Sequence, residues 1–191
     1  ALAVDLQSPG EIIDPTQGLA DLRAEVIRAC GPHSITQDPV RAVRAVRLAM
    51  DLSFRIEPGT IGQLKKAHGA MGGISGERMR DETMGILSGA RPASGLRLLD
   101  SLGLLGDVLP DLDRLRNLRQ PPQHAFDALT HSLAVVDGLA VILDVLGEQP
   151  NPDASANLTS GVLSIELGRF RLRLTAHLGQ RLADERTAAA L

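Results

Sequence analysis

One run of residues restricts the fold more than any other, because arginine and valine each recur in it at every third position. The run is Gln37-Asp38-Pro39-Val40-Arg41-Ala42-Val43-Arg44-Ala45-Val46-Arg47. In a helix, positions three apart are separated by about 300°, so the valines form one stripe and the arginines form the stripe beside it. Pro39 suits the first turn, where no backbone donor is lost. The run predicts a helix from about Thr36 or Asp38 to Leu52, with one side packed and the other facing an anion.

The core that packs against the valine stripe must be aliphatic. Of the 191 residues, 43% are hydrophobic but only 2% are aromatic, with three Phe and no Trp or Tyr. Such a chain suits a helical array of one large or two small domains. The shortage of aromatic side chains disfavours binding of single-stranded nucleic acid by base stacking. The formal net charge of −3 excludes a chain that is basic throughout, so any anion site must be local.

Turn residues divide the chain into a short β region followed by helices. Residues 2–6 and 11–13 flank Gln7-Ser8-Pro9-Gly10 and predict a β-hairpin, and an edge strand is expected at 26–30. Residues 147–160 have the composition of a linker. The predicted fold class is mainly α, a helical array with a short N-terminal β-hairpin. Besides the arginine helix, helices are expected at 19–23, 58–67, 75–87, from 92, at 109–118, 124–146, 162–182 and 184–191.

The chain carries no feature of a secreted or membrane protein. Cys30 is the only cysteine, which excludes an intrachain disulfide and favours a reducing, cytoplasmic setting. No apolar run reaches the ~20 residues that span a bilayer, so we expect no membrane partner. The missing initiator Met and the apolar end at 188–191 lead us to expect a piece of a longer chain.

Asp38 and Arg41 together offer a hydrogen-bond acceptor beside a donor. Cytosine and adenine each present an amino donor beside a ring-nitrogen acceptor, so the pair can read either edge. Guanine and uracil present the reverse order, and each unsatisfied buried group would cost about 1–3 kcal/mol. Arg44 and Arg47, on the following turns, could hold phosphates. The alternative is that Asp38 caps the helix and the arginines pair with neighbouring acids, and spacing alone favours this alternative.

A second charged cluster reads Ser75-Gly76-Glu77-Arg78-Met79-Arg80-Asp81-Glu82. Its simpler interpretation is a solvated helix start capped by Ser75. Its functional interpretation is a brace, in which Glu77 or Glu82 pairs with an arginine of the first run.

Three residues near the start of the 124–146 segment have spacings at which helical side chains can share a metal. His124, Asp127 and His131 lie three, four and seven residues apart. The remaining ligands are missing, so the spacing favours an incomplete site.

Several of these segments, in this order, resemble class II tRNA nucleotidyltransferases, the family of CCA-adding enzymes and bacterial poly(A) polymerases. The similar segments belong to the end of the catalytic head, two neck motifs (Glu-Asp-x-x-Arg-x-x-Arg and Ser-x-Glu-Arg), the body and the opening of an HD domain. They are Ala1–Asp5, Glu11–Pro15 and Gly18–Leu22 for the head, Gln37–Arg44 and Ser75–Arg78 for the neck, Gly95–Leu105 for the body, and His124–His131 for the HD domain.

The resemblance implies a role for each residue that matches a neck motif. Asp38 and Arg41 would be the protein template that reads an incoming CTP or ATP, and Arg44 and Arg47 would be further nucleotide contacts. Glu77 and Arg78 would be the structural brace. Gln37 stands where the family usually has Glu, which puts the bracing of Asp38 in question.

The resemblance also implies a division of the chain and a parent activity. Residues 1–33 would be the remnant of the head, 34–119 the neck and body, and 120–191 the start of the HD domain. The parent would use Mg²⁺ to add nucleotides from CTP or ATP to the 3′ end of tRNA or another RNA, and both CCA and poly(A) addition fit.

The family's Asp-x-Asp metal site belongs to the head segment that precedes these motifs. We therefore expect no catalytic residue here, an inactive fragment, and in His131 an incomplete HD ligand whose His-Asp partner would lie beyond Leu191. The alternatives are a helical interaction module without a nucleotide site, or part of an HD-type metal-dependent phosphohydrolase.

Overall fold

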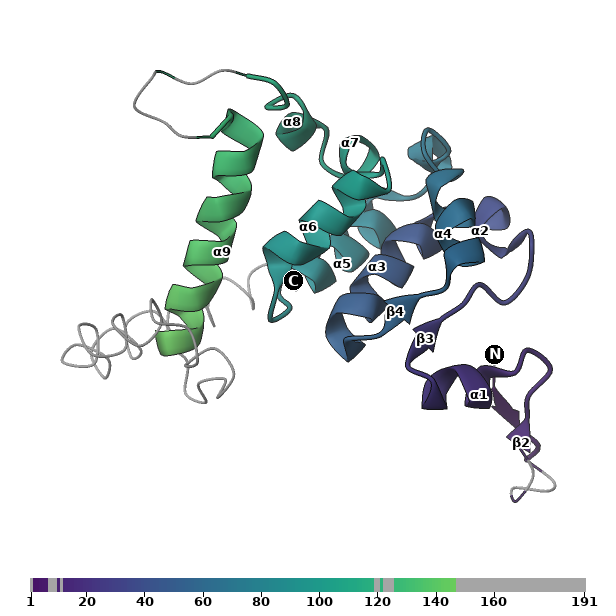
Figure 1. Cartoon of the computed structure of the whole chain (residues 1–191). Coiled ribbons are helices and arrows are strands. Elements are labelled where there is room, and N and C mark those ends of the chain that lie inside the picture. The colour runs from purple at the N-terminus through teal and green to yellow at the C-terminus, as the bar shows by residue number, and fades with distance from the viewer. Residues whose placement is uncertain (1, 7–9, 11, 119–120, 122–125, 147–191) are drawn as a thin grey trace. The chain divides into compact units, whose positions relative to one another are not determined.

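The computed structural model describes residues 2–6, 10, 12–118, 121 and 126–146 (Figure 1). The chain forms two compact units, residues 1–134 and 135–191, and each is considered by itself. The described part is mainly helical with a few two-residue strands, which confirms the predicted fold class. No helix in that part is long and apolar enough to cross a membrane.

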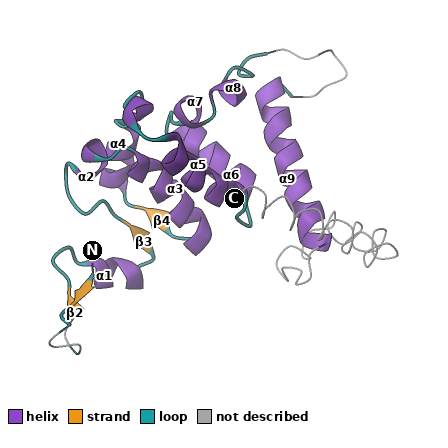
Figure 2. Cartoon of the chain, turned by 180° about the vertical axis from the view of Figure 1, so that it is seen from behind, coloured by secondary structure: helices purple, strands orange, loops and turns teal. Residues whose placement is uncertain are grey.

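The N-terminal region contains the predicted β-hairpin and a second small sheet (Figure 2). Strand β1 (Ala3–Val4) pairs antiparallel with β2 (Ile12–Ile13), and helix α1 (Gly18–Arg23) follows. Strand β3 (Val26–Ile27) pairs in parallel with β4 (Arg55–Ile56), which follows the arginine helix in the sequence. The sequence did not predict β4, because a two-residue strand is too short to show a period of two.

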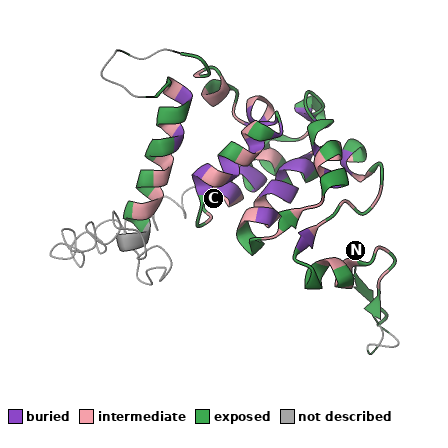
Figure 3. Ribbon diagram, in the orientation of Figure 1, coloured by how far each residue is buried: buried purple, intermediate pink, exposed green. Residues whose placement is uncertain are grey.

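The arginine helix, α3 (Val40–Leu52), is the centre of the first unit. Val40, Val43 and Val46 are fully buried, as the stripe predicted, and α3 packs against helices α5 (Gly76–Leu87) and α6 (Pro92–Ser101) (Figure 3). The helix begins later than expected, after a separate turn, α2 (Ser34–Gln37). Asp38 separates α2 from α3. Its backbone, with φ −149° and ψ 87°, is not helical, because the proline that follows disfavours the helical region for the residue before it.

The remaining helices follow their turn and capping signals. Helix α4 (Pro58–Lys65) is capped by the carboxylate of Glu57, which accepts from the backbone N–H groups of Gly59 and Thr60 at 2.9 and 2.6 Å. A 3₁₀ turn at Met71–Gly73 leads into α5, which Ser75 caps. Gly103, with φ +76°, follows α6. The last helices are α7 (Leu105–Val108), α8 (Pro110–Asp113) and α9 (Ala128–Leu146).

The predicted helix at 109–118 is wrong in length, because only α8 is α-helical there. Asn117 takes a left-handed φ of 59°, in which a helix cannot continue. Helix α9 begins at Ala128, and the side chain of Asp127 accepts from Thr130 N at 2.7 Å in its first turn. The predicted linker at 147–160 and the helices predicted beyond it lie outside the described residues.

Close packing of α5 on α6 depends on Gly95. An ideal Cβ at this buried position would lie 2.5 Å from Ile86 Cγ2. Gly95→Ala should therefore lower the free energy of unfolding by about 1–3 kcal/mol. Gly62→Ala on α4 is the matched control, because nothing lies within 4 Å of its Cβ, and it should be neutral or stabilising. Urea denaturation measures both, and equal effects would contradict this account.

Candidate functional site

The valine stripe of α3 determines where its arginines lie. Because the valines are buried, Arg41 and Arg44 remain exposed, and Arg47 lies at the edge of the packed side. Helix α5 runs beside α3 and supplies the acidic and basic partners of this row. The two charged clusters of the sequence, about forty residues apart, therefore meet in two groups of ion pairs, one around Asp38 and one around Glu82.

Asp38 connects the two clusters. Its Oδ2 accepts from Nη2 of Arg78 at 2.7 Å and lies 3.3 Å from Nε of Arg41. The hydrogen bond from Arg78 holds the pKa of the Asp38 carboxyl below its usual range, so the group is an acceptor at neutral pH. Pro39 occupies the N-cap position of α3 without a side-chain cap, so the alternative in which Asp38 caps this helix is wrong.

Arg41 is fixed at two of its nitrogens. Its Nε is oriented toward Asp38, and its Nη1 donates to the backbone carbonyl of Ser34 at 3.0 Å. Within the described part of the chain, Nη2 of Arg41 and Oδ1 of Asp38 have no hydrogen-bond partner. One donor and one acceptor of this pair are therefore available.

Glu82 holds the next two arginines. Its side chain is only 7% exposed, and its two oxygens accept from Nε of Arg44 at 2.5 Å and from Nε of Arg47 at 2.7 Å. Burial by itself would raise the pKa of Glu82, but the hydrogen bonds from Arg47 and Arg44 outweigh it and lower the pKa. The alternative in which arginines pair with neighbouring acids therefore describes Arg44 and Arg47 correctly.

Arg47 is the most enclosed member of the row. It also binds Asp51 at 3.2 Å, and its side chain is 28% exposed, against 46% for Arg44. Its stem crosses α5 at Gly85, where an ideal Cβ would lie 2.2 Å from Arg47 Cδ. The Arg47 side chain can therefore take this path across α5 only because residue 85 has no side chain.

The two predicted brace residues differ in their contacts. Arg78 binds Asp38, whereas Glu77 is exposed and forms no ion pair with any other described residue. Glu82, which the sequence offered beside Glu77, is the acid that reaches the row. The sequence signal for Glu82 is its spacing of four from Arg78, because helical residues four apart lie on the same face.

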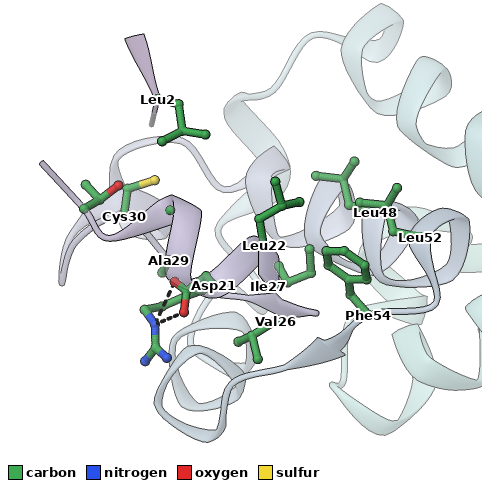
Figure 4. Close-up of a pocket in the computed structure, with 13 residues that line it drawn as sticks. Leu2, Asp21, Leu22, Val26, Ile27, Ala29, Cys30, Leu48, Leu52 and Phe54 are labelled. Atoms are coloured by element: carbon green, nitrogen blue, oxygen red, sulfur yellow. Dashed lines mark hydrogen bonds and ion pairs between the residues drawn. The ribbon is translucent and has the colours of Figure 1, made fainter. Parts of the chain in front are cut away.

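Two pockets lie beside strand β3, and one of them reaches the arginines of α3. One has a volume of about 420 Å³, and Arg41 and Arg44 contribute to its wall, whereas Asp38 and Arg47 do not. The other, of about 280 Å³, is mainly apolar, with Leu22, Leu48 and Phe54 around it (Figure 4). The segment from Ile27 to Cys30 lines both.

The histidine cluster of the sequence lies only partly within the described residues. No three His, Cys, Asp or Glu side chains of that part could hold a metal ion. Asp127 caps α9, and its hydrogen bond from the Thr130 backbone lowers its pKa, while His124 lies outside the described residues. Asp111 and Asp113 have the Asp-x-Asp spacing but form ion pairs with neighbouring arginines.

Comparisons with known proteins point to one family. Residues 53–115, from β4 to α8, match the family described as the probable RNA and SrmB-binding site of polymerase A. A multifunctional CCA protein from Nitrosospira multiformis is 36% identical over 132 residues, 67% of this chain and 32% of that protein. An A-adding tRNA nucleotidyltransferase from Deinococcus radiodurans is 31% identical over 156 residues, 79% of this chain and 35% of that protein.

Solved structures of the same kind share the fold. A CCA-adding enzyme with ATP superposes with a TM-score of 0.51 at 27% identity, over 76% of this chain and 31% of that one. A Thermotoga maritima CCA-adding enzyme complexed with tRNA gives 0.52 at 26% identity, over the same shares of the two chains. The chain spans about a third of the length of the curated relatives it matches.

The Glu82 bridge predicts a pH dependence of stability. Because the folded-state pKa of Glu82 is below its ordinary value of 4.5, its contribution is complete above pH 4.5 and is lost as the pH falls through the folded pKa. Glu82→Gln should cost about 1–3 kcal/mol at pH 7, since the arginines are partly solvated, and should flatten the loss of stability in acid. Glu77→Gln, on the same helix, is the control and should change neither quantity appreciably; denaturation between pH 7 and pH 3 compares the two variants.

Proposed function

Because the chain belongs to the class II tRNA nucleotidyltransferase and poly(A) polymerase family, we propose that its residues 34–119 are a neck and body that select the incoming nucleotide. Residues 1–33 complete the catalytic head, and 120–191 begin an HD domain. The whole enzyme adds nucleotides from CTP or ATP to the 3′ end of tRNA or another RNA, with Mg²⁺ in its head. These substrates and the single cysteine suit the cytoplasm.

The observation that carries the proposal is the availability of one acceptor on Asp38 and one donor on Arg41. An amino group of cytosine or adenine donates to Oδ1 of Asp38, and the neighbouring ring nitrogen accepts from Nη2 of Arg41. Guanine and uracil present a carbonyl to the carboxylate and an N–H to the guanidinium. Both contacts are then repulsive, so those bases bind less well.

Arg78 holds Asp38 in the orientation and charge state that this selection needs. Its hydrogen bond at 2.7 Å fixes the orientation of the Asp38 carboxylate and keeps it ionised. A protonated Asp38 would become a donor at one oxygen and would lose its preference for an amino group. Arg78 acts through Asp38, so it is a positioning residue.

Arg44 and Arg47 have different parts in the same site. Among the described residues, Arg44 is engaged only at its Nε, by Glu82, so its outer nitrogens are available for phosphate oxygens. Arg47 uses both Nε and Nη1 on acids, so it contributes mainly to the rigidity of α3 against α5. Glu82 spans both arginines and sets their spacing.

Nucleotide titration tests the template. The chain should bind CTP and ATP at least about fivefold more tightly than GTP and UTP, and Asp38→Ala should remove this preference. Asp111→Ala is the matched control, because Asp111 is also an aspartate paired with an arginine but lies on α8 and is 89% exposed. Isothermal titration calorimetry with all four nucleotides measures the preference.

Equal affinity for the four nucleotides in the unmodified chain would contradict the template and favour a helical interaction module. An unchanged preference in Asp38→Ala would contradict the assignment of the acceptor. Retention of metal in stoichiometric amount, by elemental analysis, would instead favour the HD phosphohydrolase alternative.

The chain should not transfer nucleotides without the catalytic head. Two-metal transfer needs carboxylates that hold Mg²⁺ on both sides of the reacting phosphate, and we assign these to the head. Incubation with labelled ATP, Mg²⁺ and tRNA should give no incorporation above background, and the Asp111→Ala, Asp113→Ala double variant should behave identically. Incorporation that depends on these two acids would overturn the division of roles.

A further inference from the structure

Arg28 belongs to none of the motifs that point to nucleotide selection. Like the arginines of those motifs, however, it is held in place by acidic side chains. It follows strand β3, and its Nε donates to both oxygens of Asp21 at 3.1 and 3.0 Å (Figure 4). Its Nη1 lies 3.8 Å from Glu57. The Arg28 side chain is 47% exposed, so it is fixed in place without being enclosed.

The 420 Å³ pocket brings Arg28 together with two arginines of α3. Arg28, Arg41 and Arg44 come from two separate segments and line the same hollow. No acidic residue is among the side chains that line it. The wall therefore carries three positive charges, although each arginine has an acidic partner.

Each of these arginines has an acidic partner at its Nε. Nε of Arg28 binds Asp21, Nε of Arg44 binds Glu82, and Nε of Arg41 lies within ion-pair distance of Asp38. A guanidinium held only at Nε loses its rotational freedom but keeps donors at its outer nitrogens. In Arg41 these nitrogens have other partners, because Nη1 donates to Ser34 O and Nη2 is the donor assigned to the base. Arg28 and Arg44 therefore suit an anion with several oxygens, because little of their side-chain entropy remains to be lost on binding.

The rest of the pocket offers apolar contact and few free polar groups. The hydroxyl of Ser34 donates to Gly31 O at 3.0 Å, and that of Thr60 accepts from Ala29 N at 3.0 Å. The polar binding capacity of the wall is thus mainly that of the arginines. The apolar part of the wall consists of Ile27, Ala29, Ile35, Ala45 and Leu48.

From this arrangement we propose that the pocket binds a phosphate group, for which Arg28 and Arg44 supply the hydrogen-bond donors while Arg41 contributes a neighbouring positive charge. The identity of the phosphate rests on the proposed function: it belongs to the incoming nucleotide or to the RNA 3′ end. The apolar wall receives the sugar or base attached to it. Arg28 contributes affinity in this arrangement and has no part in choosing the base.

Inorganic tripolyphosphate tests the pocket without involving a base. The chain should bind it, and Arg28→Ala should weaken binding about tenfold, as expected for a lost charge-assisted contact. Arg114→Ala is the matched control, because Arg114 also pairs with one aspartate but is 78% exposed on the segment after α8. Arg28→Lys keeps the charge without the planar guanidinium, and its affinity for tripolyphosphate should fall about threefold. This second variant keeps the test decisive if Arg28→Ala does not fold.

The pocket assignment is overturned if tripolyphosphate does not bind, or if binding by Arg28→Ala or a folded Arg28→Lys equals that of the control. These outcomes differ from failure of the template, which shows as lost preference among the four nucleotides. Competition identifies the source of the phosphate: ATP displaces tripolyphosphate if the pocket takes the nucleotide, and an RNA oligonucleotide with a free 3′ hydroxyl displaces it if the pocket takes the RNA. A change in base preference in Arg28→Ala would contradict its role as a phosphate contact.

Discussion

The carboxylate of Glu82 is the interaction on which the rest of the site depends. It is almost fully buried, and it is shared between Arg44 and Arg47 of the neighbouring helix. A buried carboxylate is costly to desolvate, and hydrogen bonds to both of its oxygens offset that cost. The bridge fixes the rotation of α3 against α5. It thereby determines where Arg78 of α5 lies relative to α3, and hence where Asp38 is held.

Small residues allow this bridge to form. Gly85 gives Arg47 a path across α5, and Gly95 brings α6 close to the other side of the same helix. The valine stripe completes the constraint, because it leaves only one face of α3 for the arginines. Packing therefore positions the charges, and the charges in turn oppose any slip between the helices.

Much of this fold could be predicted from periodicity and turn chemistry. The valine stripe predicted the buried side of α3, and Pro39 explains both its start and the extended backbone at Asp38. The charged cluster on α5 offered both Glu77 and Glu82. The spacing of four from Arg78 favours Glu82, but the choice depends on which face of α5 packs inward, and the burial of Thr83 and Ile86 is known only from the structure. Strand β4 and the pairing of Arg28 with Asp21 depend on contacts between separate segments, which no local pattern records.

The arginines of the ion pairs around Asp38, Glu82 and Arg28 are matched by as many acids. Arg28, Arg41, Arg44, Arg47 and Arg78 form ion pairs with five carboxylates, those of Asp21, Asp38, Asp51, Glu57 and Glu82. A neutral cluster projects little field beyond about one Debye length, roughly 8–10 Å at physiological salt. An anion is therefore not drawn to this site from a distance. It is recognised on contact, through the directions of the remaining N–H groups, and the rate of its arrival should change little with ionic strength.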